Sequence, residues 1–480
     1  MNFYKCNIFK VAILIFIMST ITFGANFDEL FSEGIALRDS NRFAEAVVKF
    51  EEAVKAKSKH PDANYNLGYL YYKTGNFEKA IKYYKNSQKF GFDPIKIHHA
   101  LAQVYQTIGD KQTAILEHYE AIKLAPKNPF VHTVLADLYL EQRSMSLADQ
   151  EYTNALKLDS MFVPAIVGKA NLFKHNREYA EALKLFDKAK AIDSTYAPLY
   201  LSLGQLHTEN NTFNKAVIDF TKYTELAPSD PEGYKLLAEI YTQFRNYPLA
   251  ITNSKKAIEK GDTAAGSLRF LGYLYLKAKQ PNEAKNVLEQ AIARRPDDLN
   301  GWVDLGKAYM LIDSGRSAVD AYMKAFTLDS FSVSNYAFDF GIAYYQVSKF
   351  DSSVMMFTRK IALDTLAVGA YINRGYAYIL LKKYDEAVKD LQKGIKIKPN
   401  DVQSHLVLGQ IYAFLKDQTK NVSTQQNLLK QAKTEFNTVL KLDPKNKEAK
   451  QGLEKLATPV PEFKPENIYQ DEQEEDIYNP

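Results

Sequence analysis

Residues 61–94 read PDANYNLGYLYYKTGNFEKAIKYYKNSQKFGFDP, and this stretch contains the pattern that decides the fold. Gly68 and Ala80 stand twelve residues apart in it, and large aromatic residues follow each of them closely. The alanine recurs every 34 residues, at Ala46, Ala80, Ala114, Ala148, Ala182, Ala216, Ala250, Ala284 and Ala318, and a glycine or alanine precedes each by twelve residues. A fixed period of this length predicts a repeat architecture.

The period divides most of the chain into twelve units. They start at Phe27, Pro61, Ile95, Pro129, Val163, Ala197, Pro231, Ala265, Leu299, Ser334, Val368 and Val402. Small residues allow two helix backbones to approach closely, and aromatic residues at helical spacing fill the gaps between them, so each unit is expected to be two packed antiparallel helices. One pair cannot bury its apolar face alone, and neighbouring pairs must therefore stack.

This pattern resembles the tetratricopeptide repeat, and the resemblance covers residues 27–446. It implies an all-α fold, a right-handed α-solenoid of about twelve helix-turn-helix repeats. Residues 447–457 carry Ala449, Leu453 and Leu456 on one face and charge on the other, which predicts a C-terminal capping helix. Ser353 and Lys360 replace alanines of the pattern in the tenth unit, where we expect looser packing.

The extra residues of the twelfth unit, around Lys416 to Asn427, are interpreted as a polar loop inserted between two helices. Lys416 is accordingly expected to lie on the surface, where its replacement by alanine would cost almost nothing.

The two ends of the chain differ from the repeats. Lys5 and Lys10 precede a short apolar run, and small residues follow it, so residues 1–24 are interpreted as a secretory signal peptide rather than an uncleaved anchor. Residues 458–480 are rich in proline and acidic residues and are interpreted as a disordered acidic tail. The tail is a solvated spacer, or it docks on the oppositely charged repeats or on a partner.

Composition and motifs exclude several classes of function. The 480 residues have a net charge of +4, which argues against a nucleic-acid binder, and the single cysteine, Cys6, cannot form an intrachain disulfide. The chain has no phosphate-binding glycine loop, no GxSxG elbow and no HExxH motif. We therefore predict no catalytic residue, no cofactor and, after signal cleavage, no stable transmembrane span.

Four histidines gather in the third and fourth units, at His98, His99, His118 and His132. Neighbouring helices could bring their imidazoles together as metal ligands. No acidic residue joins them at a ligand-like spacing, so packed or exposed histidines are the favoured interpretation and no metal site is predicted.

In the family that the pattern resembles, the first helix of each repeat lines a concave groove, mainly through the second, fifth, ninth, twelfth and thirteenth residues of the repeat. On this basis the candidate partner-binding residues are Phe31, Tyr65, Tyr69, Tyr72, Arg269, Tyr273, Phe338, Tyr345 and Tyr376. Exposed aromatic residues on a rigid wall are typical hot spots for a peptide or helix. The alternative is that these rings pack on their own neighbours. The carboxylate clamp of the chaperone-binding subgroup is absent, because Phe31, Ile35 and Ala100 stand at three of its five places.

The sequence therefore predicts a non-catalytic protein–protein interaction scaffold that binds a partner peptide or helix in its groove. The signal peptide places it in the cell envelope of a bacterium, as an exported, periplasmic or otherwise extracytoplasmic protein. The alternative is a binder of cell-wall glycan or another small ligand through the aromatic-lined groove.

Overall fold

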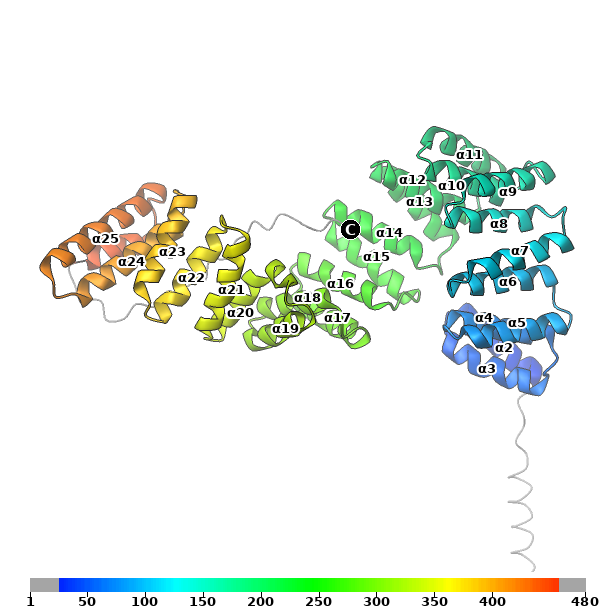
Figure 1. Ribbon diagram of the computed structural model, residues 1–480, viewed down its shortest axis with the longest axis horizontal. Helices are drawn as coiled ribbons and strands as arrows, with labels where there is room; N and C mark the ends of the chain where they lie inside the picture. Colours follow the sequence, from blue (N-terminus) through cyan, green and yellow to red (C-terminus); the bar gives the residue numbers. More distant parts are fainter. Residues whose placement is uncertain (1–25, 457–480) are drawn as a thin grey trace, which may run out of the picture. The chain divides into compact units, whose positions relative to one another are not determined.

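The computed structural model describes residues 26–456, and these residues form 25 α-helices, one short 3₁₀ helix and no strand (Figure 1). The predicted all-α solenoid of helix pairs is thus confirmed. The predicted signal peptide, residues 1–24, and the predicted acidic tail, residues 458–480, lie outside the described residues. No helix in the described part of the chain is long and apolar enough to cross a membrane.

The helices follow one another as pairs of a first and a second helix. The first seven pairs are α2 (Phe27–Asp39) and α3 (Phe43–Ala56), α4 (Pro61–Lys73) and α5 (Phe77–Lys89), α6 (Pro94–Thr107) and α7 (Lys111–Leu124), α8 (Pro129–Glu141) and α9 (Met145–Leu158), α10 (Val163–His175) and α11 (Tyr179–Ile192), α12 (Ala197–Glu209) and α13 (Phe213–Leu226), and α14 (Glu232–Gln243) and α15 (Tyr247–Glu259). The other five are α16 (Ala265–Lys277) and α17 (Pro281–Arg294), α18 (Leu299–Leu311) and α19 (Gly315–Leu328), α20 (Ala337–Gln346) and α21 (Phe350–Leu363), α22 (Val368–Leu380) and α23 (Tyr384–Ile397), and α24 (Val402–Gln418) and α25 (Val422–Leu442). A single helix, α26 (Lys447–Lys455), ends the series.

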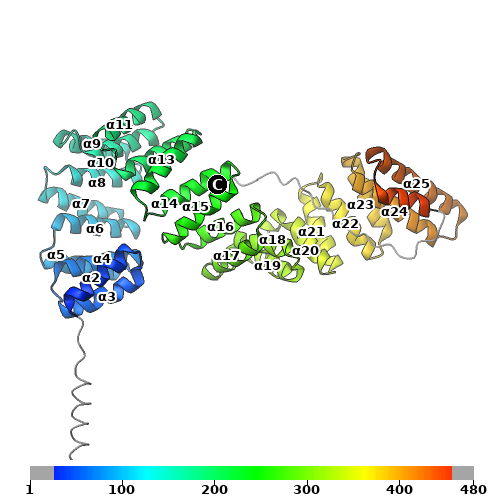
Figure 2. The ribbon, with the colours of Figure 1, turned by 180° about the vertical axis from the view of Figure 1, so that it is seen from behind.

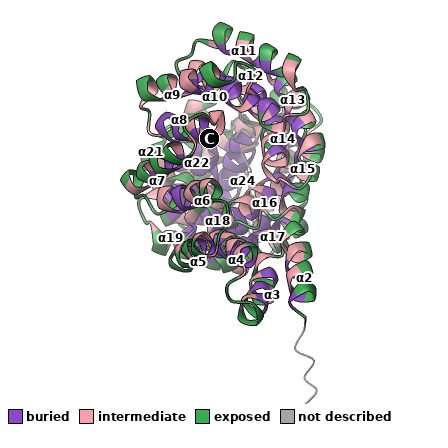
Figure 3. Cartoon of the chain, turned by 90° about the vertical axis from the view of Figure 1, so that its right-hand side faces the viewer, coloured by how far each residue is buried: buried purple, intermediate pink, exposed green. Residues whose placement is uncertain are grey.

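The described chain divides into two compact units, and each is considered by itself. The first unit ends at Ile240 and also takes in residues 259–261, and the second unit holds the rest. Within each unit the two helices of a pair lie side by side and are joined by a short turn (Figure 2). The buried residues lie on the helix faces that meet neighbouring helices, whereas exposed residues gather on outer faces and turns (Figure 3).

A glycine of the first helix faces a large ring or leucine of the second helix, sixteen residues further on. At Gly204 an added Cβ would lie 2.4 Å from the buried ring of Phe220, and at Gly68 it would lie 2.8 Å from the ring of Tyr84. The same contact joins Gly34 to Phe50, Gly272 to Leu288, Gly306 to Tyr322 and Gly341 to Phe357. The absence of a side chain at these positions thus sets how closely the two helices of a pair approach.

The turn inside a pair has one residue in the left-handed region of backbone space. Gly75 and Gly109 fill this place in two repeats, with φ of 80° and 85°. Asn41, Arg143, Arg177, Asn211, Arg245, Lys279, Asp313, Ser348 and Lys382 fill it in others. The next residue then donates its N–H to the last helical turn, as Asn76 does to the Tyr71 carbonyl at 2.8 Å. This arrangement satisfies helix-end carbonyls and reverses the chain within a few residues.

The extra residues of the twelfth repeat lengthen its helices, so the predicted polar loop is wrong. α24 has 17 residues and α25 has 21, and only residues 419–421 lie between them. Lys416 is 8% exposed, and its ammonium group donates to the Leu456 carbonyl at 2.7 Å. It is therefore a structural residue at the end of the repeats, and the expectation that it is a silent surface lysine is also wrong.

The tenth repeat is irregular before its first helix rather than at Ser353. Ser353 is fully buried, and its hydroxyl donates to the Gly341 carbonyl at 2.8 Å, which retains a close contact between the paired helices. A 3₁₀ helix, η1 (Ser332–Asn335), precedes α20, which has only 10 residues. The ninth and tenth repeats start at Leu299 and Ser334, one residue further apart than the 34-residue period, and this segment absorbs the extra residue.

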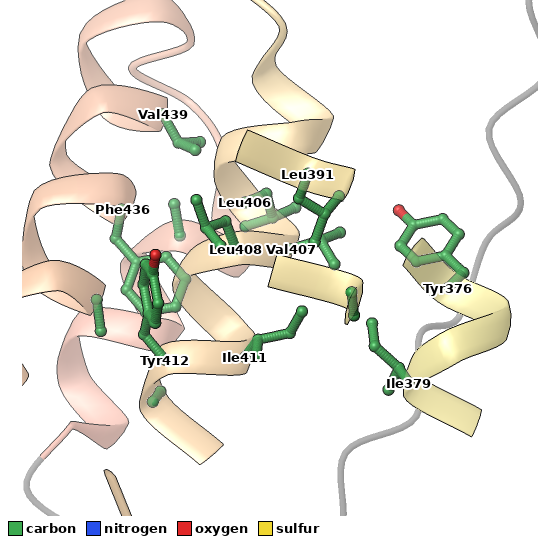
Figure 4. Packing of buried hydrophobic residues seen from close by; sticks show 14 of the residues in the cluster. Tyr376, Ile379, Leu391, Leu406, Val407, Leu408, Ile411, Tyr412, Phe436 and Val439 are labelled. Carbon is green, nitrogen blue, oxygen red and sulfur yellow. The ribbon is translucent and has the colours of Figure 1, made fainter. Parts of the chain in front are cut away.

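The C-terminal end of the repeats has its own apolar cluster, which Figure 4 shows from close by. Tyr376 and Ile379 of α22 face Leu406 and Val407 of α24 in this cluster. The short α26 packs against α24 and α25 and buries Ala449 completely. Its remaining residues are mostly charged and exposed, as a capping helix requires.

The glycine contact leads to a matched pair of substitutions. Gly204→Ala places a methyl group against the Phe220 ring, and we expect it to cost about 1–3 kcal/mol through overpacking. Gly266→Ala has nothing within 4 Å of the added Cβ, and we expect it to be neutral or to stabilise α16 by up to about 1 kcal/mol. Thermal unfolding of the two variants measures the difference, and equal losses at both positions would contradict this account of the packing.

Candidate partner-binding wall

The first helices of successive repeats lie next to one another in the first unit. α4 contacts α6, and α10 contacts both α8 and α12. We call the side chains that these helices carry at the second, fifth, ninth, twelfth and thirteenth places of each repeat, up to Glu239, the first-helix wall. Side-chain hydrogen bonds cross it from repeat to repeat: Arg38 to Asn66, Thr107 to Tyr72 at 3.2 Å, Gln106 to Glu141, and Lys174 to Gln205 at 2.9 Å. These bonds brace the wall laterally among the first four repeats and between the fifth and the sixth.

Two of the predicted aromatic residues pack largely on their own neighbours. The Tyr65 ring stacks on Phe92 with 4.3 Å between the ring centroids and lies 5.5 Å from Tyr84. The Phe31 ring packs edge-on against Phe50 at 5.4 Å. Both residues are only half-buried, but these contacts hold their rings in place. They act as supports of the wall as much as contact points.

Tyr69 and Tyr72 offer more to a partner. Both are half-buried, and the Lys73 ammonium lies 5.5 Å from the centroid of the Tyr69 ring and 6.0 Å from that of Tyr72. The Tyr72 hydroxyl accepts the Thr107 hydrogen bond from the next repeat. The two rings are thus partly exposed on a braced surface, which is the setting of a binding hot spot.

Carboxylates follow these rings along the wall, and the pattern of aromatic residues did not point to them. Asp137, Glu141, Glu209 and Glu239 are all exposed. The dense protein around the wall raises the pKa of Asp137 to about 6, against an opposing hydrogen bond from the Tyr152 hydroxyl at 2.5 Å. Desolvation likewise raises the pKa of Glu141 and of Glu239. Their place in the 34-residue register was the available signal.

In the second unit, the predicted partner-binding residue Arg269 lies close to two carboxylates of the same chain. Its guanidinium lies 3.4 Å from the Asp298 carboxylate and 3.6 Å from the Asp304 carboxylate. Both aspartates are buried, and burial raises the pKa of Asp304 to about 6. Arg269 therefore neutralises buried carboxylates, which makes it a structural residue first.

The predicted aromatic residues of the second unit are not all accessible. Tyr273, Phe338 and Tyr345 are half-buried, and Lys277 lies 5.5 Å from the centroid of the Tyr273 ring. Tyr376 is completely buried, so its assignment as a groove residue is wrong. Its hydroxyl accepts a hydrogen bond from Gln403 of the next repeat at 2.6 Å, and its ring belongs to the cluster of Figure 4. The following repeat covers this part of the surface.

The four histidines do not converge on one point. His98 and His132 each bind a carboxylate of the second helix, Glu117 at 2.6 Å and Glu151 at 2.7 Å. Within residues 26–456 no group of three His, Cys, Asp or Glu side chains is placed to hold a metal ion.

His118 and His99 pack against each other instead. The His118 side chain is 3% exposed and takes the place that a buried ring holds in other repeats, and its ring lies 5.8 Å from His99. Nδ1 of each ring is buried without a hydrogen-bond partner among the described residues. Burial lowers the pKa of His118 to about 3, with His99 and His98 contributing, and burial also lowers the pKa of His99.

This histidine pair predicts an acid-sensitive third repeat. The unfolded chain binds a proton at His118 near pH 6.5 and the folded chain does not, so stability is lost as the pH falls below 6.5 towards the folded value. At pH 5 the loss from His118 is about 2 kcal/mol. We expect His118→Phe, which restores the ring of other repeats, to reduce the drop in melting temperature between pH 7.5 and pH 5. An unchanged drop would show that His118 is not the cause.

Comparison with known proteins supports the repeat assignment. Models of the tetratricopeptide repeat match residues 31–94, residues 368–401, and residues 95–128, 197–230 and 267–298. No curated protein sequence matched the chain.

Several solved structures are similar to parts of the chain. The C-terminal part of a TPR repeat-containing protein from Cytophaga hutchinsonii is 18% identical, covering 52% of this chain and 98% of that one, with a TM-score of 0.43. PilF from Pseudomonas aeruginosa is 21% identical, covering 43% of this chain and 95% of that one, with a TM-score of 0.36. A chain of the APC/C hetero-tetramer Cut9–Hcn1 is 14% identical, covering 90% of this chain and 96% of that one, with a TM-score of 0.29.

The 34-residue period, the paired helices that follow it and the matches of the repeat models in five separate stretches all agree. The chain therefore belongs to the tetratricopeptide repeat family.

Proposed function

We propose that this protein is a non-catalytic interaction scaffold of the cell envelope, and that it binds a peptide or helix of a partner protein on the first-helix wall. The observation that carries the proposal is the position of Tyr69 and Tyr72, two partly exposed rings on a surface braced between repeats. A rigid wall loses little conformational entropy on binding, and each ring offers a large apolar area for a partner to cover.

Two hollows of the described surface give little support to the alternative of a small-molecule or glycan site. One is lined by residues 74–78 with Ile81 and Ile108, and the other by residues 313–317 and 346–348. Both lie at turns, and neither includes a predicted groove residue. We therefore favour a macromolecular partner laid along the helices.

The binding proposal predicts where a partner is captured. A photo-crosslinking amino acid in place of Tyr69 should capture a partner protein in cells of the native host, whereas the same probe in place of Leu116 should not. Leu116 is a matched control because it is 61% exposed on a second helix, α7. Tyr69→Ala should weaken binding of the captured partner by about 2 kcal/mol. Equal capture at both positions, or capture of wall polymer instead of protein, would contradict the proposal.

The envelope location rests on the sequence of residues 1–24, with two lysines before a short apolar run. Cleavage by a signal peptidase should leave a mature chain that begins at Ala25 or Asn26. N-terminal sequencing and intact mass of the protein from the native host measure this directly. A full-length chain recovered with Met1 in a membrane fraction would show an uncleaved anchor instead.

A further inference from the structure

We infer that the segment bound by the first-helix wall is basic, a stretch of a partner protein in which Lys and Arg residues accompany aromatic or aliphatic anchors. This inference rests on the proposed function, because it names the chemistry of the partner that the same surface takes. It is carried by the aromatic rings at one end of the wall, the carboxylates along it and the hydrogen bonds that connect the rings to one of them.

The aromatic end of the wall already holds an ammonium group of the chain itself. Lys73 lies over Tyr69 and Tyr72, within the distance at which a cation is attracted to the face of a ring. In the second unit, Lys277 lies over the ring of Tyr273. Tyr273 is at the ninth place of its repeat and Lys277 at the thirteenth, as Tyr69 and Lys73 are in theirs. A ring face that attracts a flexible surface lysine also attracts a lysine or arginine of a partner, which can displace it.

Four carboxylates of the wall have no cation of the described chain in direct contact with them. Some exposed carboxylates elsewhere in the first unit pair with a nearby cation, as Glu33 does with Lys49 at 2.8 Å and Glu181 with Lys184 at 2.7 Å, whereas Glu52 and Asp187 on second helices form no ion pair among the described residues. Among the described residues, Asp137, Glu141, Glu209 and Glu239 form no ion pair within 4 Å. A lysine or arginine of a partner could therefore form ion pairs with these four carboxylates.

Two cations of the wall, Lys174 and Lys235, act on Glu209 and Glu239 through space, but neither forms an ion pair with these two carboxylates. Lys174 is 6% exposed, and its ammonium group donates to the neutral amide of Gln205 rather than to a carboxylate. Lys235 lies next in line and is already paired with Glu232 at 2.9 Å. The exposed surplus along this stretch is thus negative, although the whole chain has a net charge of +4.

Desolvation of the carboxylates strengthens their attraction for a partner's cation. The pKa values of Asp137, Glu141 and Glu239 are raised because the protein around the wall disfavours their charged forms. A bound ammonium or guanidinium favours the charged form, so its attraction is larger here than at a fully solvated site. An acidic segment would meet like charges at the same places.

Hydrogen bonds connect the rings to Glu141, which lies in the nearest repeat with a carboxylate of this group. Tyr72 is bonded to Thr107 of the third repeat, and Gln106 beside it is bonded to Glu141 of the fourth. A segment anchored on the rings of the second repeat can therefore continue along the third repeat to Glu141 of the fourth. The packing of α10 against α8 and α12 continues the row of first helices towards Glu209.

The test uses the full-length protein and two synthetic peptides of sixteen residues. One repeats Lys-Leu-Lys-Phe, and the other replaces every lysine by glutamate. Fluorescence anisotropy at low and at physiological salt measures binding to the wild type and to three variants. These are Tyr69→Ala, the double variant Glu209→Gln with Glu239→Gln, and the double variant Glu52→Gln with Asp187→Asn. The last pair is the control, since both residues are exposed on second helices.

We expect the lysine peptide to bind the wild type and to bind more weakly as salt rises. Tyr69→Ala should weaken its binding about tenfold or more. The Glu209 and Glu239 double variant should weaken it about fivefold, and the control pair should change it less than about twofold. The acidic residues near the C-terminus are present in every variant, so differences between variants report on the wall alone.

Three outcomes would overturn the inference. Tighter binding of the glutamate peptide, still dependent on Tyr69, would reverse the charge of the partner and leave the proposed function standing. Equal binding of the lysine peptide to all variants, control included, would place it elsewhere on the surface. No binding of the lysine peptide would also reject a basic partner. The proposed function is tested separately by crosslinking at position 69. It falls if that probe captures no partner protein, captures wall polymer instead, or captures no more than the probe at position 116, so the two failures are distinguishable.

Discussion

In many of the helix pairs, the close contact between a glycine of the first helix and a large side chain of the second is the constraint on which the rest of the structure depends. Gly204 against Phe220 and Gly68 against Tyr84 set the distance between paired helices, because no side chain stands between backbone and ring. That distance fixes where the first helices of successive repeats meet, and so which side chains can bridge them. The braced wall with Tyr72 and Thr107 is a consequence of this spacing, repeated along the first unit.

The sequence predicts the helix pairs well because one local rule, a small residue followed by a ring, repeats every 34 residues. The prediction from the sequence fails in the twelfth repeat, where extra residues interrupt the 34-residue spacing. The polar stretch from Lys416 to Asn427 was interpreted as a loop, but its residues add turns to α24 and α25. Leu428 and Leu429 lie in the longer α25 and pack against the C-terminal cluster. The preceding polar residues lie on the exposed side of the helix, and without the expected spacing of apolar residues their sequence resembles that of a loop.

The site was harder to predict than the fold, because exposure depends on the neighbouring repeat. Tyr376 has the register of a groove residue, but Gln403 and the next first helix cover it. The carboxylates of the wall have the same register as the rings, but acidic residues are common on any surface and so do not mark a site in the sequence. In the sequence, His118 is one of four clustered histidines. Only the structure shows that it takes the place of a buried ring and packs against His99. Register identifies which residues face the wall, and packing decides which of them a partner can reach.

The closed C-terminal end has a consequence for how copies of this protein meet. A stack of identical repeats has no intrinsic reason to stop, because the last pair presents the same apolar face as every pair before it, and that face would accept the first pair of another copy. Here α26 packs on the last pair, and the Lys416 ammonium group holds its end in place by donating a hydrogen bond to the Leu456 carbonyl. The exposed side chains of α26 are mostly charged, so within the described residues this end carries a polar cap in place of an apolar helix-pair face, which disfavours end-to-end stacking of two copies here.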